Sequence, residues 1–499
     1  MDNNLRRIII ATIISFAFFA AYDYFVLQPQ TKPQITNQVV EKKEDKVSKS
    51  INIKSENIAT INAKNYQIKI DSLGRISSYI LKQNIYNEKG KHIELISPNL
   101  PKPLEVRFLD KNLNKEVFKN RVEVSSKELN ITDTPKTLTI THYLTGLTLK
   151  KEITFYPDGH YDLKTFISKP TTYYISDGYR PSVEVDPLTV HGALIKKSDD
   201  TLEIIEDGDA KDETINSAKI VANFDRYYTT LLFSKKPFEA VVSSDKEENP
   251  IIFIKSDSNL NLIGYIGPKL VDRLASIDKE LVDVVQYGVG TFFARNLFLV
   301  LDAIYKAIGN WGIAIILLVV LVRVILFPLT FRGMVSMYKL KDLAPKLKEI
   351  QEKYKKDPQK LQMHMMKIYK EEKVNPLGGC LPLLLQIPIF YGIYKVLLYS
   401  IELKGVPFLW VDDLSVKDPY FIWPVLMGIT MYFHQKLTPT NFQDPMQEKV
   451  FKFLPVIFTI MIITFPAGLV IYWTVNNILS IIQQWIINSF MAAKKGSKK

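Results

Sequence analysis

Hydrophobic and polar residues follow two different patterns along the 499-residue chain. Between about residues 58 and 255, short runs alternate apolar and polar positions, as in TLTITHYL and LTLKKEITFY, and Gly, Pro, Asn and Asp separate them. Alternation with a period of two is typical of strands that bury one face. From about residue 311 to 488, long apolar runs dominate instead. The pattern predicts a β-rich domain followed by membrane-spanning helices.

The β-rich region contains roughly a dozen such runs within about two hundred residues, which favours a large sandwich over a small barrel. Its histidines, His92, His142, His160 and His191, are widely separated, and we assign them no chemistry. The single cysteine, Cys380, cannot form an intrachain disulfide, and the six histidines lack metal-ligand spacing. We therefore predict no cofactor, no metal and no enzymatic activity.

Six apolar segments are candidates to cross a bilayer. The first covers residues 8–27 after Arg6 and Arg7, and it fits either a cleaved signal peptide with processing near Ala20 or, because it is longer than a signal core needs, an uncleaved anchor. Residues 28–57 are too polar to order themselves and predict a tether. The other five segments cover residues 311–329, 377–398, 420–434, 451–465 and 467–488.

The predicted fold is a polytopic α-helical membrane protein of six spans with a periplasmic all-β sandwich domain. In chain order we expect an N-terminal transmembrane anchor (1–27), a flexible tether (28–57), the β-sandwich domain (58–280), an amphipathic interfacial helix (281–309), a transmembrane segment (310–331), a basic helical hairpin (332–375), a transmembrane segment (376–400), a periplasmic loop (401–418), a transmembrane segment (419–435), a cytoplasmic loop (436–450), two transmembrane segments (451–466 and 467–489) and a basic tail (490–499).

The segment 281–309 carries apolar residues at helical spacing, interrupted by charges. A helix that lies on the membrane surface has this pattern, and so does an ordinary core helix of the β domain. The span that follows closely favours the membrane surface.

The net charge is +12, and the basic residues lie beside apolar segments rather than in one compact patch, so we predict no binding of DNA. The connection 332–373 contains twelve basic residues, and the C-terminal tail is also basic, whereas the connection 401–418 is mainly acidic. Positive residues are retained on the cytoplasmic side of a membrane. Six crossings then place both termini in the cytoplasm and the β domain outside the membrane, which is the periplasm if the cell has an outer membrane.

The basic connection itself predicts two helices that are broken at Asp357 and Pro358. With twelve basic and six acidic residues, it suits anionic lipid or ribosomal RNA, although topology alone explains the charge equally well. Methionines in its second helix offer a flexible surface for a nascent chain, or they serve simple packing. The candidate recruitment residues are Lys346, Lys348, Lys353, Lys355, Lys356, Met363 and Met366.

Arg323 lies twelve residues after Trp311, about 18 Å along a helix and thus inside the membrane. An arginine there costs at least ~2.5 to 3.5 kcal/mol on insertion scales and normally marks a function. Snorkelling past Pro328 toward the headgroups is the alternative.

The last span carries a polar stripe at intervals of three or four residues: Tyr472, Asn476, Asn477, Ser480, Gln483 and Gln484. Such a stripe forms interhelical hydrogen bonds or lines a wet groove. A groove shared with Arg323 explains both features. There a cation attracts an acidic residue of a passing segment while lipid receives the adjoining apolar segment.

Four motifs resemble those of the YidC-type membrane protein insertases: NPLGGCLPLLLQIPIF from Asn375, LVRVILFPLT around Arg323, DPMQ at Asp444 and FPAGLVIYW from Phe465. The β domain, with IGPK near Gly267, is similar to that of the Gram-negative form. The resemblance implies a five-helix core, a hydrophilic groove with a functional arginine, and a substrate slide along the third and fifth spans. The candidate groove residues are Arg323, Gln386, Tyr472, Trp473, Asn476, Asn477, Ser480 and Gln484.

The resemblance also implies a location in the bacterial inner membrane, with nascent membrane proteins, the Sec translocon, the ribosome and anionic lipids as partners. Two positions depart from the family pattern: Val319 replaces a hydroxyl residue and Trp473 a tyrosine. The rival functions are a small-molecule or anion transporter, which lacks the support of an internal repeat, and an anchored sugar-binding or enzymatic domain.

Overall fold

The computed structural model describes residues 55–87, 90–99, 101–183, 189–288, 291–354, 357–372, 381–438 and 445–496. The chain divides into two compact units, Met1–Gln286 and Tyr287–Lys499, which we call the β unit and the helical unit. The predicted anchor 1–27 and most of the predicted tether 28–57 lie outside the described residues.

Strands form where the sequence alternates, because alternate side chains then face the core. In β9 (Leu147–Phe155), every second residue is buried. The other strands are β1 (Asn57–Asn62), β2 (Tyr66–Asp71), β3 (Ile76–Leu81), β4 (Ile93–Glu94), β5 (Val106–Phe108), β6 (Glu123–Val124), β7 (Glu128–Asn130), β8 (Lys136–Leu144), β10 (His160–Ile167), β11 (Tyr173–Gly178), β12 (Gly192–Lys197), β13 (Leu202–Glu206), β14 (Glu213–Phe224), β15 (Tyr228–Ser244), β16 (Pro250–Ser256) and β17 (Asn261–Pro268). The prediction of a β-rich N-terminal region is thus confirmed.

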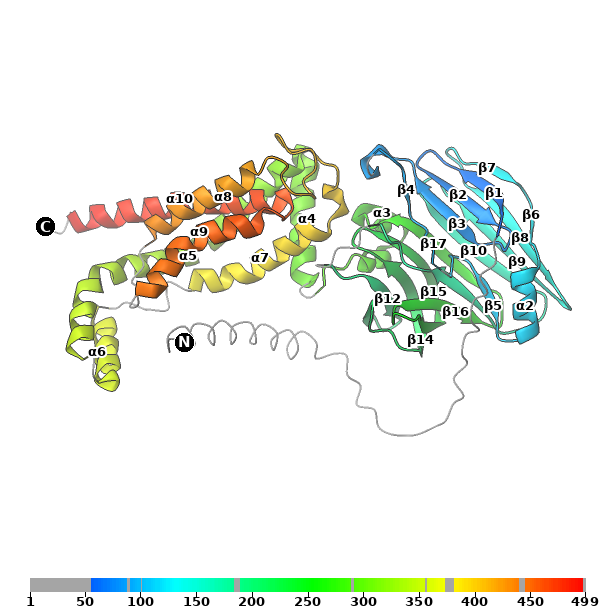
Figure 1. Cartoon of the computed structure of the whole chain (residues 1–499), viewed down its shortest axis with the longest axis horizontal. Coiled ribbons are helices and arrows are strands. Elements are labelled where there is room, and N and C mark those ends of the chain that lie inside the picture. The colour runs from blue at the N-terminus through cyan, green and yellow to red at the C-terminus, as the bar shows by residue number, and fades with distance from the viewer. Residues whose placement is uncertain are drawn as a thin grey trace. The chain divides into compact units, whose positions relative to one another are not determined.

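The strands form two sheets, shown in blue to green in Figure 1. The smaller sheet has the order β4-β3-β2-β1-β7, and the larger follows the path β13-β12-β14-β15-β17-β10-β9-β8-β6, with β16, β11 and β5 attached beside β15. The long strand β15 pairs with β17 through its first half and with β16 through its second half. Two short helical segments, η2 (Asn84–Tyr86) and α2 (Lys111–Lys119), lie between strands, and two more, α3 (Val271–Ile277) and η3 (Lys279–Val284), follow the last strand.

Polar groups of the β unit join the two sheets. Lys151 of β9 donates from its Nζ to the carbonyl oxygens of Gly74 (2.6 Å) and Leu104 (3.0 Å). Burial lowers the pKa of Lys151 to about 7 and holds the pKa of the neighbouring His142 well below its ordinary value. Gly74 allows this close approach, because it has φ +71° and a Cβ there would lie 2.9 Å from Ile140.

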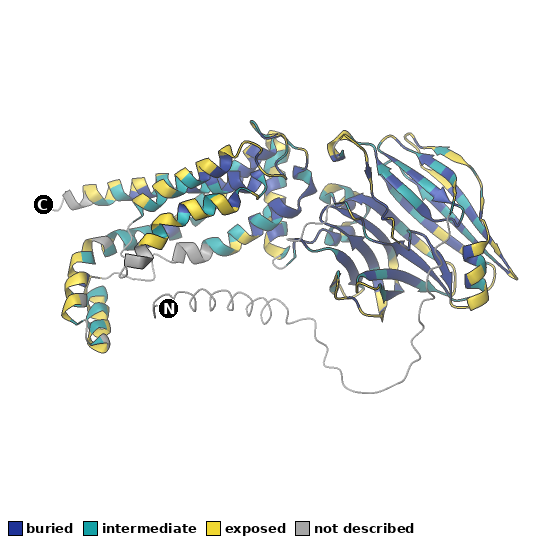
Figure 2. Ribbon diagram, in the orientation of Figure 1, coloured by how far each residue is buried: buried dark blue, intermediate teal, exposed yellow. Residues whose placement is uncertain are grey.

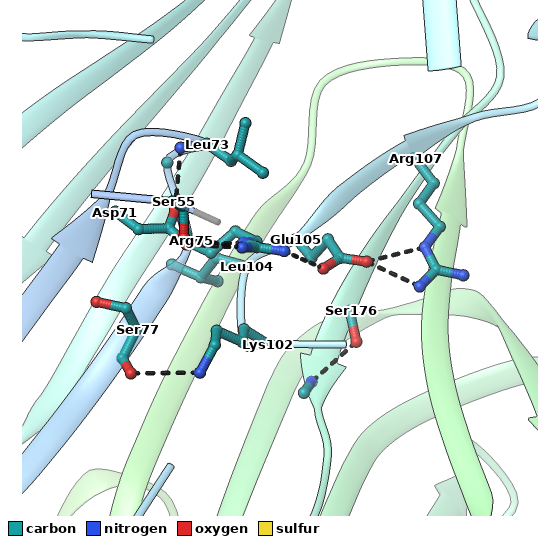
Figure 3. A network of polar contacts seen from close by, with 12 residues as sticks. Ser55, Asp71, Leu73, Arg75, Ser77, Lys102, Leu104, Glu105, Arg107 and Ser176 are labelled. Atoms are coloured by element: carbon teal, nitrogen blue, oxygen red, sulfur yellow. Dashed lines mark hydrogen bonds and ion pairs between the residues drawn. The ribbon is translucent and has the colours of Figure 1, made fainter. Parts of the chain in front are cut away.

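A buried ionic network continues from this contact (Figure 3). Arg75 pairs with Asp71 of β2 at 2.8 Å and with Glu105 at 2.8 Å, and Glu105 also accepts from Arg107 of β5 at 2.8 Å. All four side chains are almost fully buried. Each buried guanidinium therefore has a carboxylate partner, which compensates for the loss of water.

The helical unit contains α4 (Thr291–Ile308), α5 (Trp311–Lys353), α6 (Pro358–Glu371), α7 (Leu381–Tyr399), η5 (Ile401–Leu403), α8 (Ile422–Leu437), α9 (Pro445–Ile462) and α10 (Ala467–Gly496). The helix expected over 281–309 begins later, at Thr291. Residues before it instead form η3, whose Asp283 pairs with Lys196 of the β unit at 2.8 Å, and Gly288 turns the chain at φ +71°.

The helix α5 is longer than the expected span, because it runs without interruption from Trp311 into the first helix of the basic hairpin. It bends visibly before α6 (Figure 1), and it contains Pro328 and Pro345, which weaken a helix by removing backbone donors. Among the described residues, one helix is long and apolar enough by length and composition to cross a membrane, within Trp311–Leu340. The count of six spans therefore stays a prediction.

We expect Glu105→Gln to lower the free energy of unfolding of the β unit by about 3 to 5 kcal/mol, because it leaves the buried guanidinium of Arg107 without its carboxylate partner and Arg75 with Asp71 alone. Pulse proteolysis in urea measures this. Glu239→Gln is the matched control, since Glu239 pairs with Lys255 at a partly exposed site and its loss should cost less than about 1 kcal/mol. Equal losses would contradict the expectation.

Candidate functional site

The side chain of Arg323 extends from α5 to one face of α10. Its Nε donates to Asn476 Oδ1 at 2.9 Å, and its Nη2 donates to Ser480 Oγ at 2.6 Å and to the Asn476 carbonyl oxygen at 3.3 Å. Its Nη1 donates to Gln483 Oε1 at 3.3 Å. The three acceptor residues share a helix face because they are three or four positions apart. We call these four residues the arginine cluster.

The acceptors of Arg323 are all neutral. Within the described part of the chain, no carboxylate forms an ion pair with this guanidinium, and the side chain remains partly exposed. Neutral oxygens satisfy its hydrogen-bonding groups without cancelling its charge. The cluster therefore retains an attraction for an anion, which is stronger in an apolar environment than in water.

One apolar layer closes the arginine cluster toward the first turns of α5 and α10. Val319, one turn before Arg323, is 1% exposed, and it lies in a stretch of almost fully buried residues on both helices: Ala314, Ile315, Leu318, Leu469, Val470 and Ile471. Figure 2 shows buried residues gathered at this end of the helical unit. The departure at Val319 thus belongs to a packed apolar region next to the cluster.

A second contact joins α10 to α7. Gln386 Nε2 donates to the Tyr472 hydroxyl at 3.0 Å, and Tyr472 is 1% exposed. The ring of the neighbouring Trp473 lies 4.7 Å from that of Phe390 and 5.9 Å from that of Phe458. Trp473 therefore joins an aromatic cluster between α7, α9 and α10, and no hydrogen bond links it to Arg323.

The residues of the polar stripe of α10 do not all face Arg323: some contact α5, Tyr472 contacts α7, and others contact α8 or α10 itself. Asn477 faces α8, where its Nδ2 lies 3.5 Å from the Met427 carbonyl oxygen and from Thr430 Oγ1. Gln484 donates to Asn488 on its own helix at 2.9 Å. These two predicted groove residues serve interhelical and local bonding rather than the arginine cluster. Gln483, which we did not include among the candidate groove residues, does bind Arg323.

The basic hairpin has a small apolar core. Leu343 and Leu347 of α5 pack against residues of both helices: Leu340, Met365, Ile368 and Tyr369. The second helix starts at Pro358, with Asp357 accepting from the Lys360 amide at 3.1 Å. A helix break at Asp357 and Pro358 was predicted from the sequence and is confirmed.

The recruitment candidates lie mainly on the surface of the hairpin. Met363 and Met366 are 60% and 49% exposed, and Lys348 and Lys353 are exposed as well. Lys346 pairs with Glu372 at 3.0 Å. Two further candidates, Lys355 and Lys356, lie outside the described residues.

Comparison with known proteins gives consistent matches. A family model described as 60Kd inner membrane protein matches residues 303–495. The chain is 50% identical to the membrane protein insertase YidC of Wolinella succinogenes over 99% of this chain and 96% of that protein. It is 47% identical to the membrane protein insertase YidC of Campylobacter jejuni over 100% of this chain and 99% of that protein. A crystal structure of an active YidC insertase with its first transmembrane domain resolved covers 88% of this chain and 95% of its own, at 20% identity and a TM-score of 0.39.

We expect Asn476→Ala to destabilise the helical unit by about 1 to 3 kcal/mol, because it leaves the Nε of Arg323 without its acceptor. All five tryptophans lie in this unit, so tryptophan fluorescence during unfolding in detergent reports on it. Asn477→Ala serves as the control, since its contacts are longer, and should cost less. If both variants lose equal stability, the cluster does not depend on this bond.

Proposed function

Since this chain belongs to the YidC family of membrane protein insertases and inserts proteins into membranes, we propose that the arginine cluster receives the polar part of the inserted chain. The observation that carries the proposal is the charge of Arg323, which is bound by neutral oxygens alone. A carboxylate of the substrate would exchange weak neutral contacts for a charge-assisted pair.

The cluster would lower the cost of moving polar groups into the membrane without covalent chemistry. A carboxylate in hydrocarbon loses its water, and that loss dominates the barrier. Arg323 and the side-chain oxygens of Asn476, Ser480 and Gln483 would replace part of this hydration. The adjoining apolar part of the substrate would meanwhile contact lipid, which costs it nothing.

We propose six crossings, with both termini in the cytoplasm and the β unit in the periplasm of a bacterial cell with an inner membrane. The distribution of basic residues supports this topology. So does the continuity of α5, which passes from its apolar part directly into the basic hairpin.

The helix α4 would lie in the membrane surface. It buries Ala294, Phe298 and Leu301 against the helical unit, whereas Phe292 and Phe293 are 75% and 54% exposed. Large exposed aromatic residues beside a span are typical of interfacial helices.

The basic hairpin would recruit substrates. Its net positive charge suits the ribosome and anionic lipids, and exposed Met363 and Met366 suit the apolar side chains of a nascent membrane protein. The Sec translocon is a further proposed partner, and DNA is not among the partners we propose. The alternative of a small-molecule or anion transporter is not favoured, because the similar curated proteins are insertases.

We expect Arg323→Ala to reduce insertion of a single-span test protein with an acidic translocated tail by about tenfold, the effect of one lost charge-assisted contact. Protease protection in vesicles that carry the full chain measures insertion. A substrate whose tail carboxylates are replaced by amides should lose much less, and Arg323→Lys should keep part of the acidic preference. An equal loss for both substrates would refute the role in charge recruitment.

We expect the double variant Met363→Ser, Met366→Ser to lower photo-crosslinking between the hairpin and ribosome-bound nascent chains several-fold, because it removes both exposed apolar side chains from the proposed contact surface. The hairpin should stay equally resistant to protease, since neither residue joins its core. Gln362→Ser, an exposed neighbour, controls for surface change. Unchanged crosslinking would exclude these methionines as a contact.

A further inference from the structure

Residues 401–421 connect α7 to α8, and we call them the cap segment. The segment contributes side chains to the core of the helical unit, because Leu403, Val411 and Leu414 are at most 1% exposed. It contacts the ends of helices that carry the arginine cluster. Its charged residues have no part in the proposed function so far.

Asp418 organises the cap segment. It is fully buried, and its carboxylate accepts from Trp410 Nε1 at 3.2 Å, the Tyr420 amide at 3.0 Å and the Trp423 amide at 2.7 Å. The residue before α8, Phe421, gives no side-chain cap, so Asp418 supplies the acceptor that the first turn requires. The Trp410 ring stacks on that of Trp423 at 5.0 Å.

The same segment fixes the first turns of two more helices. For α10, the Ala467 amide donates to the Val416 carbonyl oxygen at 2.7 Å and the Gly468 amide to the Leu414 carbonyl oxygen at 3.0 Å. For α5, a Cβ at Gly312 would lie 2.1 Å from the Phe408 ring, so the ring rests directly on the backbone. The starts of α5, α8 and α10 are thereby tied to one loop.

These contacts fix how far α10 is shifted along α5, and so whether the acceptors on α10 lie opposite Arg323. Asn476 lies nine residues after Ala467, about 13 Å along α10, and Arg323 about 18 Å along α5. The apolar layer around Val319 is buried and lies between the helix starts and the arginine cluster. Because this layer is closely packed, a displacement of a helix start is passed on to the cluster. A slip by one residue shifts a helix by about 1.5 Å, which is enough to break a hydrogen bond.

We propose that Asp418 is a positioning residue for insertion: it ties the cap segment to α8 and so keeps α10 in the register at which its acceptors meet Arg323. This inference rests on the proposed role of Arg323. It predicts that the loss of Asp418 removes the preference for acidic substrates and not insertion in general.

The test compares insertion of the acidic-tail and amide-tail substrates by the full chain in vesicles. Arg323→Ala should lower the acidic-to-amide ratio about tenfold, and Asp418→Ala should lower it toward the same value. Asp412→Ala removes an exposed carboxylate of the same segment and should keep the wild-type ratio. The double variant Arg323→Ala, Asp418→Ala should show no further fall in the ratio, because both changes act on one contact.

The outcomes are distinguishable. If Asp418→Ala lowers insertion of both substrates equally, Asp418 is only structural and the inference is overturned. If Arg323→Ala leaves the ratio unchanged, the proposed role of Arg323 fails and this inference with it. Should Asp418→Ala not accumulate in the membrane, Trp410→Phe removes one donor while retaining the stacked ring; a lowered ratio supports the inference, and a wild-type ratio overturns it.

Discussion

A guanidinium inside an apolar helix must find hydrogen-bond acceptors, and Arg323 finds them on one face of α10. The arrangement of the helical unit depends on this contact, because α10 has to lie beside α5 with Asn476, Ser480 and Gln483 at the right height. The remaining polar groups of α10 then turn toward α7 and α8, where Tyr472 and Asn477 find their own partners. These polar contacts join α10 to three helices, α5, α7 and α8.

The β unit treats buried arginine differently. There, Arg75 and Arg107 share the carboxylate of Glu105, and Arg75 also pairs with Asp71. A paired guanidinium has little charge left to offer and serves to hold two sheets together. Arg323 also has hydrogen bonds from all three of its guanidinium nitrogens, but no anion is among its described partners. Hydrogen-bond satisfaction and charge compensation are separate requirements, and in our proposal a carboxylate of the substrate provides the charge compensation for Arg323.

The sequence predicted the two kinds of architecture, the hairpin break and the family, and the relatives confirm the family resemblance. The period of the polar stripe indicated a helix face but not its neighbours, so Asn477 and Gln484 were grouped with Arg323 and Gln483 was left out. The segment before α4 forms η3 instead, and its Asp283 pairs with Lys196, a contact between residues far apart in sequence that periodicity does not describe. The role of Asp418 depends likewise on where a loop folds, which periodicity does not describe.

Because α5 is continuous, the first helix of the basic hairpin and the residue Arg323 belong to one helix. If this helix were rigid, every tilt of the hairpin would also displace Arg323 from its hydrogen-bond acceptors. Pro328 and Pro345 weaken the helix without ending it, since each leaves the carbonyl four residues earlier without its helical donor. Pro328 lies between Arg323 and the hairpin, and bending there costs less than elsewhere in the helix. A bend at Pro328 therefore tilts the hairpin relative to the part of α5 that carries Arg323, and the bonds of Arg323 need not break.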